Sequence, residues 1–140
     1  MSQHLPAPLN ECPVLARASA TGKQKVQGKH RPRFPNTIKR SIDFESAADD
    51  WNSDPNLARW DYLLLSTHKG WTAVEVHQAS ASDLRRKKKG TQTILRQHCL
   101  GMLTAIQSWH VCVEGEIHPT QRRQLADAQI HISRHFLDTP

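Results

Sequence analysis

The sequence predicts an α/β (α+β) fold in which a small mixed β-sheet is flanked by helices. Two strand patterns joined by turn residues occupy 60–78, and a third, SWHVCVEG, occupies 108–115. Apolar residues at helical spacing lie before, between and after them, so the expected order is helix, strand, strand, helix, strand, helix. The 140-residue length is that of one domain.

Residues 1–40 form a basic arm with eight Lys or Arg residues and one acid, whereas residues 41–140 carry eleven basic residues and twelve acids. Five prolines and the lack of sustained periodicity predict that the arm is disordered in isolation. Its charge predicts either contact with nucleic-acid phosphates or a solubilising tail. The candidate nucleic-acid residues are Lys23, Lys25, Lys29, Arg31, Arg33, Lys39 and Arg40.

The folded domain, residues 41–140, is expected to begin with a short helix. Asp43 is a suitable N-cap, and the chain from 52 to 56 contains an Asp-Pro pair that ends the helix near residue 51. The apolar residues that repeat at helical spacing between these points are Phe44, Ala47, Ala48 and Trp51.

A β-hairpin follows. Residues 62–65 form an apolar run, 67–70 supply turn residues, and the next strand is rich in β-branched and aromatic residues. A side-chain period of two places Glu75 and His77 on one face of the second strand, and Asp61 lies at the start of the first. Carboxylates so placed suit Mg²⁺ or Mn²⁺, whereas the alternative is a half-buried hairpin whose polar face meets solvent.

The second helix is expected to be capped by Ser80 or Ser82. At 100° per residue from Leu84, Lys88 falls at about 40°, inside the apolar stripe, whereas Lys87 falls at about 300° and is expected to be solvated. A lysine on such a stripe either has a partner or extends its ammonium to water. The stripe consists of Leu84, Thr91, Leu95, Cys99, Met102 and Ile106, with Gly101 as an expected break.

The third strand alternates Trp109, Val111 and Val113 with polar residues, and Pro119 suits the first turn of a last helix. The apolar stripe expected on that helix is Leu125, Ala128, Ile132 and Phe136.

These elements and residues resemble the PD-(D/E)xK nuclease-like superfamily, which has a restriction-endonuclease-like core of a helix, an antiparallel strand set, a crossover helix and a further strand. The superfamily's first acid matches Asp61 in WDYLLL, and its (D/E)xK motif matches Glu75-Val76-His77 in AVEVHQ. The resemblance covers about residues 42–115. It implies metal-dependent hydrolysis of phosphodiester bonds in DNA or RNA.

The resemblance also implies the roles of individual residues. Asp61 and Glu75 would bind Mg²⁺ or Mn²⁺, with the Val76 carbonyl as a further ligand. His77 and Lys88 would serve the attacking water and the phosphate, since the motif lysine is replaced by His77 and lysines in this superfamily also occur on neighbouring elements. Glu45 resembles the accessory acid of the first helix.

The sequence departs from the superfamily pattern in two further ways. Trp60 stands where the motif has proline, and no strand is evident before Asp61, although residues 56–60 or the arm are able to supply one. A catalytically inactive member of the same fold, binding nucleic acid or protein, therefore remains the leading alternative. Pairing of a small domain as a homodimer also stays open.

Other classes find less support in the sequence. No run approaches the roughly 20 apolar residues of a membrane span, and no secretory signal is evident, so a cytoplasmic location is expected. Three cysteines give neither a disulfide framework nor a zinc finger, and P-loop, dinucleotide and GxSxG motifs are missing. Nine histidines leave a transition-metal site as a rival, through pairs such as His110 with Cys112, His131 with His135, and His98 with Cys99.

Overall fold

The computed structural model describes residues 5–51, 56–76, 80–136 and 138. His77, one of the candidate site residues, lies outside them. Among the described residues no helix is long and apolar enough to cross a membrane.

The six described strands form one mixed sheet in which the spatial order of the strands equals their order along the chain. Neighbours from β1 to β4 pair antiparallel, whereas β5 and β6 each run parallel to the preceding strand. The predicted α/β class with a mixed sheet is therefore confirmed. The strands are β1 (Ser19–Thr21), β2 (Ile38–Asp43), β3 (Tyr62–Ser66), β4 (Gly70–Val76), β5 (Ser108–Cys112) and β6 (Ile130–Ser133).

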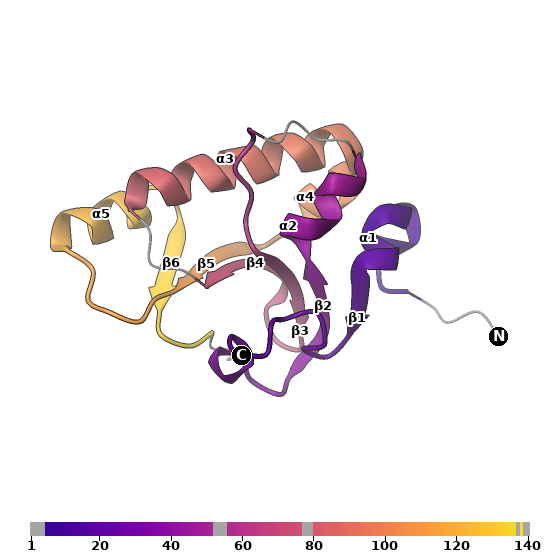
Figure 1. Ribbon diagram of the computed structural model, residues 1–140, viewed down its shortest axis with the longest axis horizontal. Helices are drawn as coiled ribbons and strands as arrows, with labels where there is room; N and C mark the ends of the chain where they lie inside the picture. The colour runs from indigo at the N-terminus through magenta and orange to yellow at the C-terminus, as the bar shows by residue number, and fades with distance from the viewer. Residues whose placement is uncertain (1–4, 52–55, 77–79, 137, 139–140) are drawn as a thin grey trace.

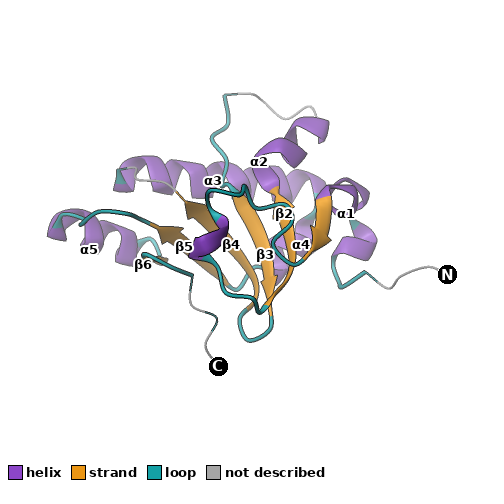
Figure 2. Cartoon of the chain, turned by 60° about the horizontal axis from the view of Figure 1, so that its bottom comes forward, coloured by secondary structure: helices purple, strands orange, loops and turns teal. Residues whose placement is uncertain are grey.

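The helices gather on one face of the sheet. Figures 1 and 2 show α3 lying along this face, with α5 beyond one end and α1, α2 and α4 toward the other. The α-helices are α1 (Pro13–Ala18), α2 (Phe44–Ala47), α3 (Ala81–His98), α4 (Leu100–Ala105) and α5 (Pro119–Asp127). Short 3₁₀ turns are η1 (Leu9–Glu11), η2 (Arg31–Arg33) and η3 (Ala48–Trp51).

The predicted helix starts are confirmed by side-chain caps. Asp43 accepts a hydrogen bond from the Ser46 N–H, and Ser80 accepts one from the Asp83 N–H. The first helix does reach residue 51, because η3 continues α2 directly. The break expected at Gly101 comes slightly earlier, since α3 ends at His98 and α4 begins at Leu100.

The expectation that Ile132 and Phe136 belong to the last helix is wrong. This helix ends at Asp127, and Gln129 adopts a left-handed backbone conformation with φ of 60°. The chain then turns into β6, which contains Ile132, while Phe136 packs against the opposite face of the sheet. A strand of four residues is too short for its alternation to be distinguished from a helical stripe.

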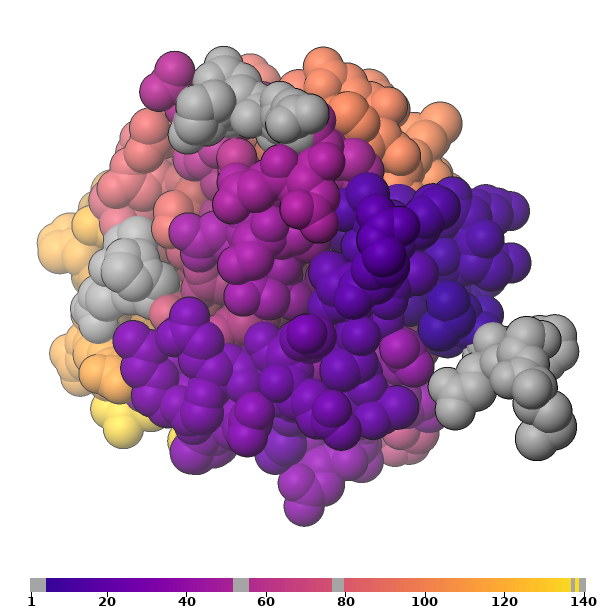
Figure 3. All heavy atoms as spheres, turned by 45° about the vertical axis from the view of Figure 1, so that its right-hand side comes forward, coloured from indigo at the N-terminus to yellow at the C-terminus, as the bar shows by residue number. Residues whose placement is uncertain are grey.

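The prediction of a disordered arm is wrong for residues 5–40. This segment forms η1, α1, β1, η2 and the start of β2, and it buries Leu9, Leu15, Val26 and Phe34 to 5% exposure or less. These apolar residues show no single periodicity because they pack on two different faces of the sheet. Figure 3 shows the indigo-to-purple N-terminal residues packed against the magenta residues that follow them.

The face of the sheet opposite the helices has its own small core. It is covered by the segment between β1 and β2 and by the residues after β6. The Tyr62 hydroxyl lies 2.8 Å from His30 Nδ1 and accepts a hydrogen bond from the Gln27 N–H, while the Phe136 N–H donates to the Arg33 carbonyl. The buried residues of this core are Val26, Phe34, Ile38, Tyr62, Leu64, Val74, Cys112 and Phe136.

The loop before β3 packs closely on α3. A Cβ atom placed on Gly90 would lie 1.9 Å from the Ala58 carbonyl oxygen, so only glycine allows this approach. One residue further, Thr91 Oγ1 accepts a hydrogen bond of 2.8 Å from the Trp60 N–H. These contacts hold the residues that lead into Asp61 against the middle of α3.

We predict that Gly90→Ala destabilises the protein, although alanine favours helices intrinsically. The added methyl group must displace the Ala58 backbone, and overpacking of this kind costs about 1–3 kcal/mol. Urea unfolding would measure the change. Gly28→Ala is the matched control, because its Cβ would meet nothing within 4 Å. Equal stability of the two variants would contradict the assigned contact.

A second prediction concerns His110 of β5, which is 8% exposed and stacks on His131 with ring centroids 4.8 Å apart. Burial, followed by the charges of His131 and Lys69, lowers the pKa of His110 to about 4. Because the unfolded chain takes up this proton near pH 6.5, the neutral His110 favours the native state above that pH. This contribution falls as the pH drops from about 6.5 to about 4.

We therefore expect the parent protein to lose up to about 3 kcal/mol more stability than His110→Phe between pH 7 and pH 4. The replacement keeps a ring beside Phe136, whose edge-to-face centroid distance to His110 is 5.1 Å. Chemical denaturation of both proteins across this range provides the measurement. Parallel stability curves would show that His110 is not responsible.

Candidate functional site

Two carboxylates meet at the end of the sheet where β3 begins and β4 ends. The antiparallel register pairs Tyr62 with Val74, and its continuation places Asp61 opposite Glu75. Glu75 Oε1 accepts a hydrogen bond of 3.0 Å from the Asp61 N–H, and Asp61 Oδ2 accepts one of 3.1 Å from the Val76 N–H. The structure thus brings together the three predicted residues Asp61, Glu75 and Val76.

Glu75 is fully buried, at 0% exposure, and its partner is a lysine from α3. Lys87 Nζ donates a hydrogen bond of 2.5 Å to Glu75 Oε2 while its side chain remains 24% exposed. Buried carboxylates are usually paired in this way, because an isolated charge in the protein interior is costly. Lys87 is therefore the lysine of the site.

The assignment of Lys88 to the site is wrong. Its ammonium donates a hydrogen bond of 2.7 Å to the Ala128 carbonyl and lies 5.4 Å from the centroid of the Trp109 ring. Lys88 does lie on the inner side of α3, but it faces α5. Its ammonium stabilises the C-terminal end of that helix.

The error comes from the width of the buried face of α3. Gly90 and Ile94 are also buried, at about 240° and 280° in the same projection, so the buried arc extends beyond the stripe drawn through Leu84 and Leu95. Lys87, at about 300°, lies within this arc on the side of β4. If the small residue Gly90 is counted as part of the buried stripe, the sequence identifies Lys87 as the lysine that faces β4.

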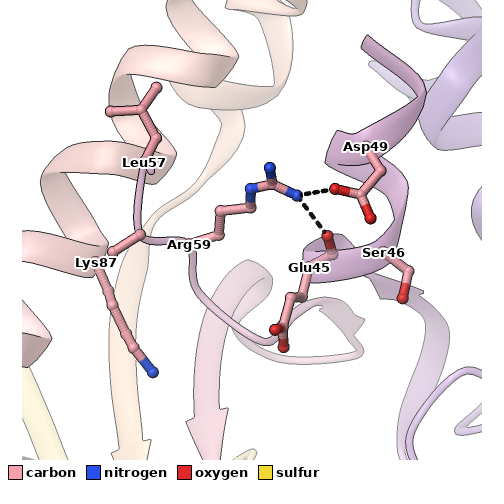
Figure 4. Close-up of a pocket in the computed structure, with 7 residues that line it drawn as sticks. Glu45, Ser46, Asp49, Leu57, Arg59 and Lys87 are labelled. Carbon is pink, nitrogen blue, oxygen red and sulfur yellow. Dashed lines mark hydrogen bonds and ion pairs between the residues drawn. The ribbon is translucent and has the colours of Figure 1, made fainter. Parts of the chain in front are cut away.

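A polar hollow of about 420 Å³ opens beside this ion pair, between α2 and the loop before β3. Figure 4 shows Arg59 extending across it, with Nη1 hydrogen-bonded to the Glu45 carbonyl and to Asp49 Oδ1. The Glu45 carboxylate and the Lys87 ammonium lie on either side of Arg59 in this view. The lining residues include Glu45, Ser46, Asp49, Leu57, Arg59 and Lys87.

Burial and neighbouring acids raise the pKa of two carboxyl groups here. Burial and then the Asp61 charge raise the pKa of Glu75 to about 7, although Lys87 opposes the shift. Burial, followed by the charges of Asp61 and Asp43, likewise raises the pKa of Glu45. Burial alone would lower the pKa of Lys87, but Glu75, Asp61 and Glu45 outweigh it and raise the pKa. Lys87 is therefore the cation on which all three acids act.

The donor set suits a hard cation, but the described side chains do not form a closed ligand cage. Both Glu75 oxygens are occupied by protein donors and Asp61 Oδ2 accepts from the Val76 N–H, whereas the Glu45 carboxylate accepts no hydrogen bond from the described residues. No group of three or more His, Cys, Asp or Glu side chains with metal-binding geometry occurs in the described ranges. His110 stacks on His131, and His98 stacks on Trp51.

The candidate nucleic-acid residues of the arm divide into two groups. Lys23 donates to the Phe34 carbonyl and to Asn36, and Arg40 donates to Ser19. Arg31 and Arg33 likewise bond backbone carbonyls, and Arg33 also pairs with Glu114. Within the described part of the chain, the exposed side chains that form no such bond are Lys25, Lys29 and Lys39.

No protein-family model, curated protein or solved structure matches this chain. The site is therefore interpreted from its own geometry.

We predict that Lys87→Met lowers the free energy of unfolding by about 2–4 kcal/mol, because it leaves the buried Glu75 carboxylate without its cation. Lys88→Met is the matched control and should cost less, since it removes only a contact to a carbonyl and a ring. The double variant Glu75→Gln/Lys87→Met should recover most of the loss, as measured by denaturant unfolding. Additive losses in the double variant would argue against the pair.

Proposed function

We propose that this protein is a metal-dependent nuclease that hydrolyses phosphodiester bonds of DNA or RNA. The observation that carries the proposal is the convergence of Asp61, Glu75 and Lys87, which come from the residue before β3, from β4 and from α3. An acid, a second acid on the adjacent strand and a lysine are the residue types that the resemblance to the PD-(D/E)xK superfamily implies for the centre of its site.

The topology gives independent support. The antiparallel strands β2, β3 and β4 are followed by the crossover helix α3 and then by the parallel strand β5. The resemblance implies this order of strands and crossover helix, but it places the first helix before the strands, whereas α2, which carries Glu45, lies between β2 and β3. The strand that the sequence did not show before Asp61 is β2, at the end of the arm.

Asp61 and Glu75 would hold a Mg²⁺ or Mn²⁺ ion, with Glu45 as an accessory acid across the hollow and the Val76 carbonyl as a further ligand. Such an ion supplies Lewis-acid stabilisation of the phosphate charge and lowers the pKa of bound water. Lys87 holds a positive charge beside the scissile phosphate and orients the attacking water, the role of the lysine missing from position 77. His77 remains a proposed proton acceptor.

Arg59 positions the acidic wall of the hollow. Its guanidinium joins the Glu45 carbonyl to Asp49, and its own side chain is only 9% exposed. These two hydrogen bonds, both from Nη1, fix α2 and the 3₁₀ turn that follows it relative to the loop that leads into Asp61. The distance between Glu45 and the two central carboxylates therefore depends on Arg59.

A non-catalytic protein that binds nucleic acid or protein is the second candidate. The observation that favours it is that Asp61 and Lys87 already satisfy both oxygens of Glu75. An ion pair of this kind also serves as a structural element. Binding of Mg²⁺ or Mn²⁺ distinguishes the two, because only the nuclease requires an ion at these carboxylates.

The proposal predicts cleavage of DNA or RNA by the purified chain in the presence of Mg²⁺ or Mn²⁺ and loss of cleavage in EDTA. Glu75→Gln and Lys87→Ala should each lower kcat about 100-fold or more, as removal of a group that stabilises transition-state charge does. Gel-based cleavage of labelled oligonucleotides measures this effect, with folding checked by circular dichroism.

Lys88→Ala is the matched control and should retain near-parental activity, because Lys88 bonds α5 instead of the site. Cleavage that survives in Glu75→Gln, or that is equal with and without divalent ions, would overturn the proposal. Isothermal titration of Mg²⁺ or Mn²⁺ into the parent chain and Asp61→Asn provides the corresponding binding measurement.

A further inference from the structure

A second hollow, of about 500 Å³, lies next to the proposed active site. Ser46 of α2 lines both hollows, so the turn that carries Asp43 and Ser46 is the wall between them. The far side of the second hollow is built by the chain from Gln24 to Arg31. A ligand that occupies one hollow and extends past Ser46 therefore enters the other.

The far wall is a fixed part of the fold. The Lys25 N–H donates a hydrogen bond of 2.9 Å to Ser41 Oγ, and the Gln27 N–H donates one of 3.2 Å to the Tyr62 hydroxyl. Between them Val26 is buried at 1% exposure in the small core on the face of the sheet opposite the helices. Tyr62 directly follows Asp61. The start of β3 therefore holds the far wall of the second hollow, and the residue just before it is the first acid of the proposed site.

The polar groups of this wall suit a phosphate. The Lys25 side chain is exposed and forms no hydrogen bond or ion pair with the described residues. Arg31 uses Nε and Nη2 to bond the Val26 and Gln24 carbonyls, which leaves Nη1 without a partner among the described residues. Both cations line the hollow, together with the amide side chains of Gln24 and Gln27.

The two acids at this hollow do not cancel that charge at the far wall. Asp43 is committed as the N-cap of α2, with one oxygen accepting from the Ser46 N–H and the other from Ser46 Oγ. Asp50 belongs to η3, on the same side as Asp43. The described lining includes no aromatic residue on which a base would stack, so the hollow fits a sugar–phosphate unit better than a base.

We infer that the second hollow binds the sugar–phosphate unit adjacent to the scissile phosphate, with Lys25 as its main phosphate contact. The substrate is then a polynucleotide chain that crosses Ser46 and occupies both hollows, instead of a small phosphodiester. This inference rests on the proposed nuclease function, because only a nuclease has a scissile phosphate. Binding of a backbone phosphate by Lys25, however, does not require cleavage.

The test compares Lys25→Ala with Lys89→Ala. Both variants remove one exposed lysine, and Lys89 does not line either hollow. On single-stranded DNA and RNA 12-mers, Lys25→Ala should raise KM about three- to tenfold with little change in kcat, while Lys25→Arg restores it. On bis(p-nitrophenyl) phosphate, which is too short to reach past Ser46, Lys25→Ala should behave as the parent.

A binding experiment separates this inference from the proposed function. Fluorescence anisotropy with labelled 12-mers in EDTA should show weaker binding by Lys25→Ala and a salt dependence reduced by about 0.7 in log–log slope, with Lys89→Ala unchanged. If the parent chain cleaves nothing but Lys25 still governs binding, the nuclease proposal fails and the phosphate site stands. Equal behaviour of Lys25→Ala and Lys89→Ala in both experiments would overturn the inference.

Discussion

The burial of the Glu75 carboxylate is the constraint around which the helical side of this protein is organised. A carboxylate at 0% exposure on an interior strand needs donors on both oxygens, because desolvation of an unpaired charge costs several kcal/mol. One donor comes from the neighbouring strand, through the Asp61 N–H, and the other from Lys87 on α3. The rotation of α3 about its axis is therefore tied to the position of one side chain on β4.

The same helix is held a second time, about three turns after its N-cap Ser80. Gly90 admits the Ala58 carbonyl, and Thr91 binds the Trp60 N–H, so the loop that leads into Asp61 rests directly on α3. Asp61, Glu75 and Lys87 thus belong to a closed circuit of contacts between β3, β4 and α3. Such rigid support is typical of sites whose chemistry requires preorganised charges.

Much of this arrangement was predictable from local patterns. The alternation of side chains predicted the face of the strand on which Glu75 lies, and the turn residues predicted the hairpin. Asp43 and Ser80 predicted two helix starts as N-caps. The large apolar residues alone did not decide between Lys87 and Lys88, because both lie within about 70° of the centre of the buried arc; the small residue Gly90 and the positions of β4 and α5 separate them. That the arm is folded was equally unpredictable from local patterns, since Val26 and Phe34 are buried by contact with Tyr62 and Leu64 of the distant strand β3.

Each strand of the sheet pairs with the next one along the chain. Every newly synthesised strand therefore meets a strand that has already emerged, which allows the sheet to grow from β1 toward β6 during synthesis. The core on the face opposite the helices joins segments that are far apart in the chain, because Phe34 packs on Phe136 and the Arg33 carbonyl accepts a hydrogen bond from the Phe136 N–H. During synthesis, the segment between β1 and β2 is therefore available to cover this face before β5 and β6 emerge, and Phe136 completes the core after β6.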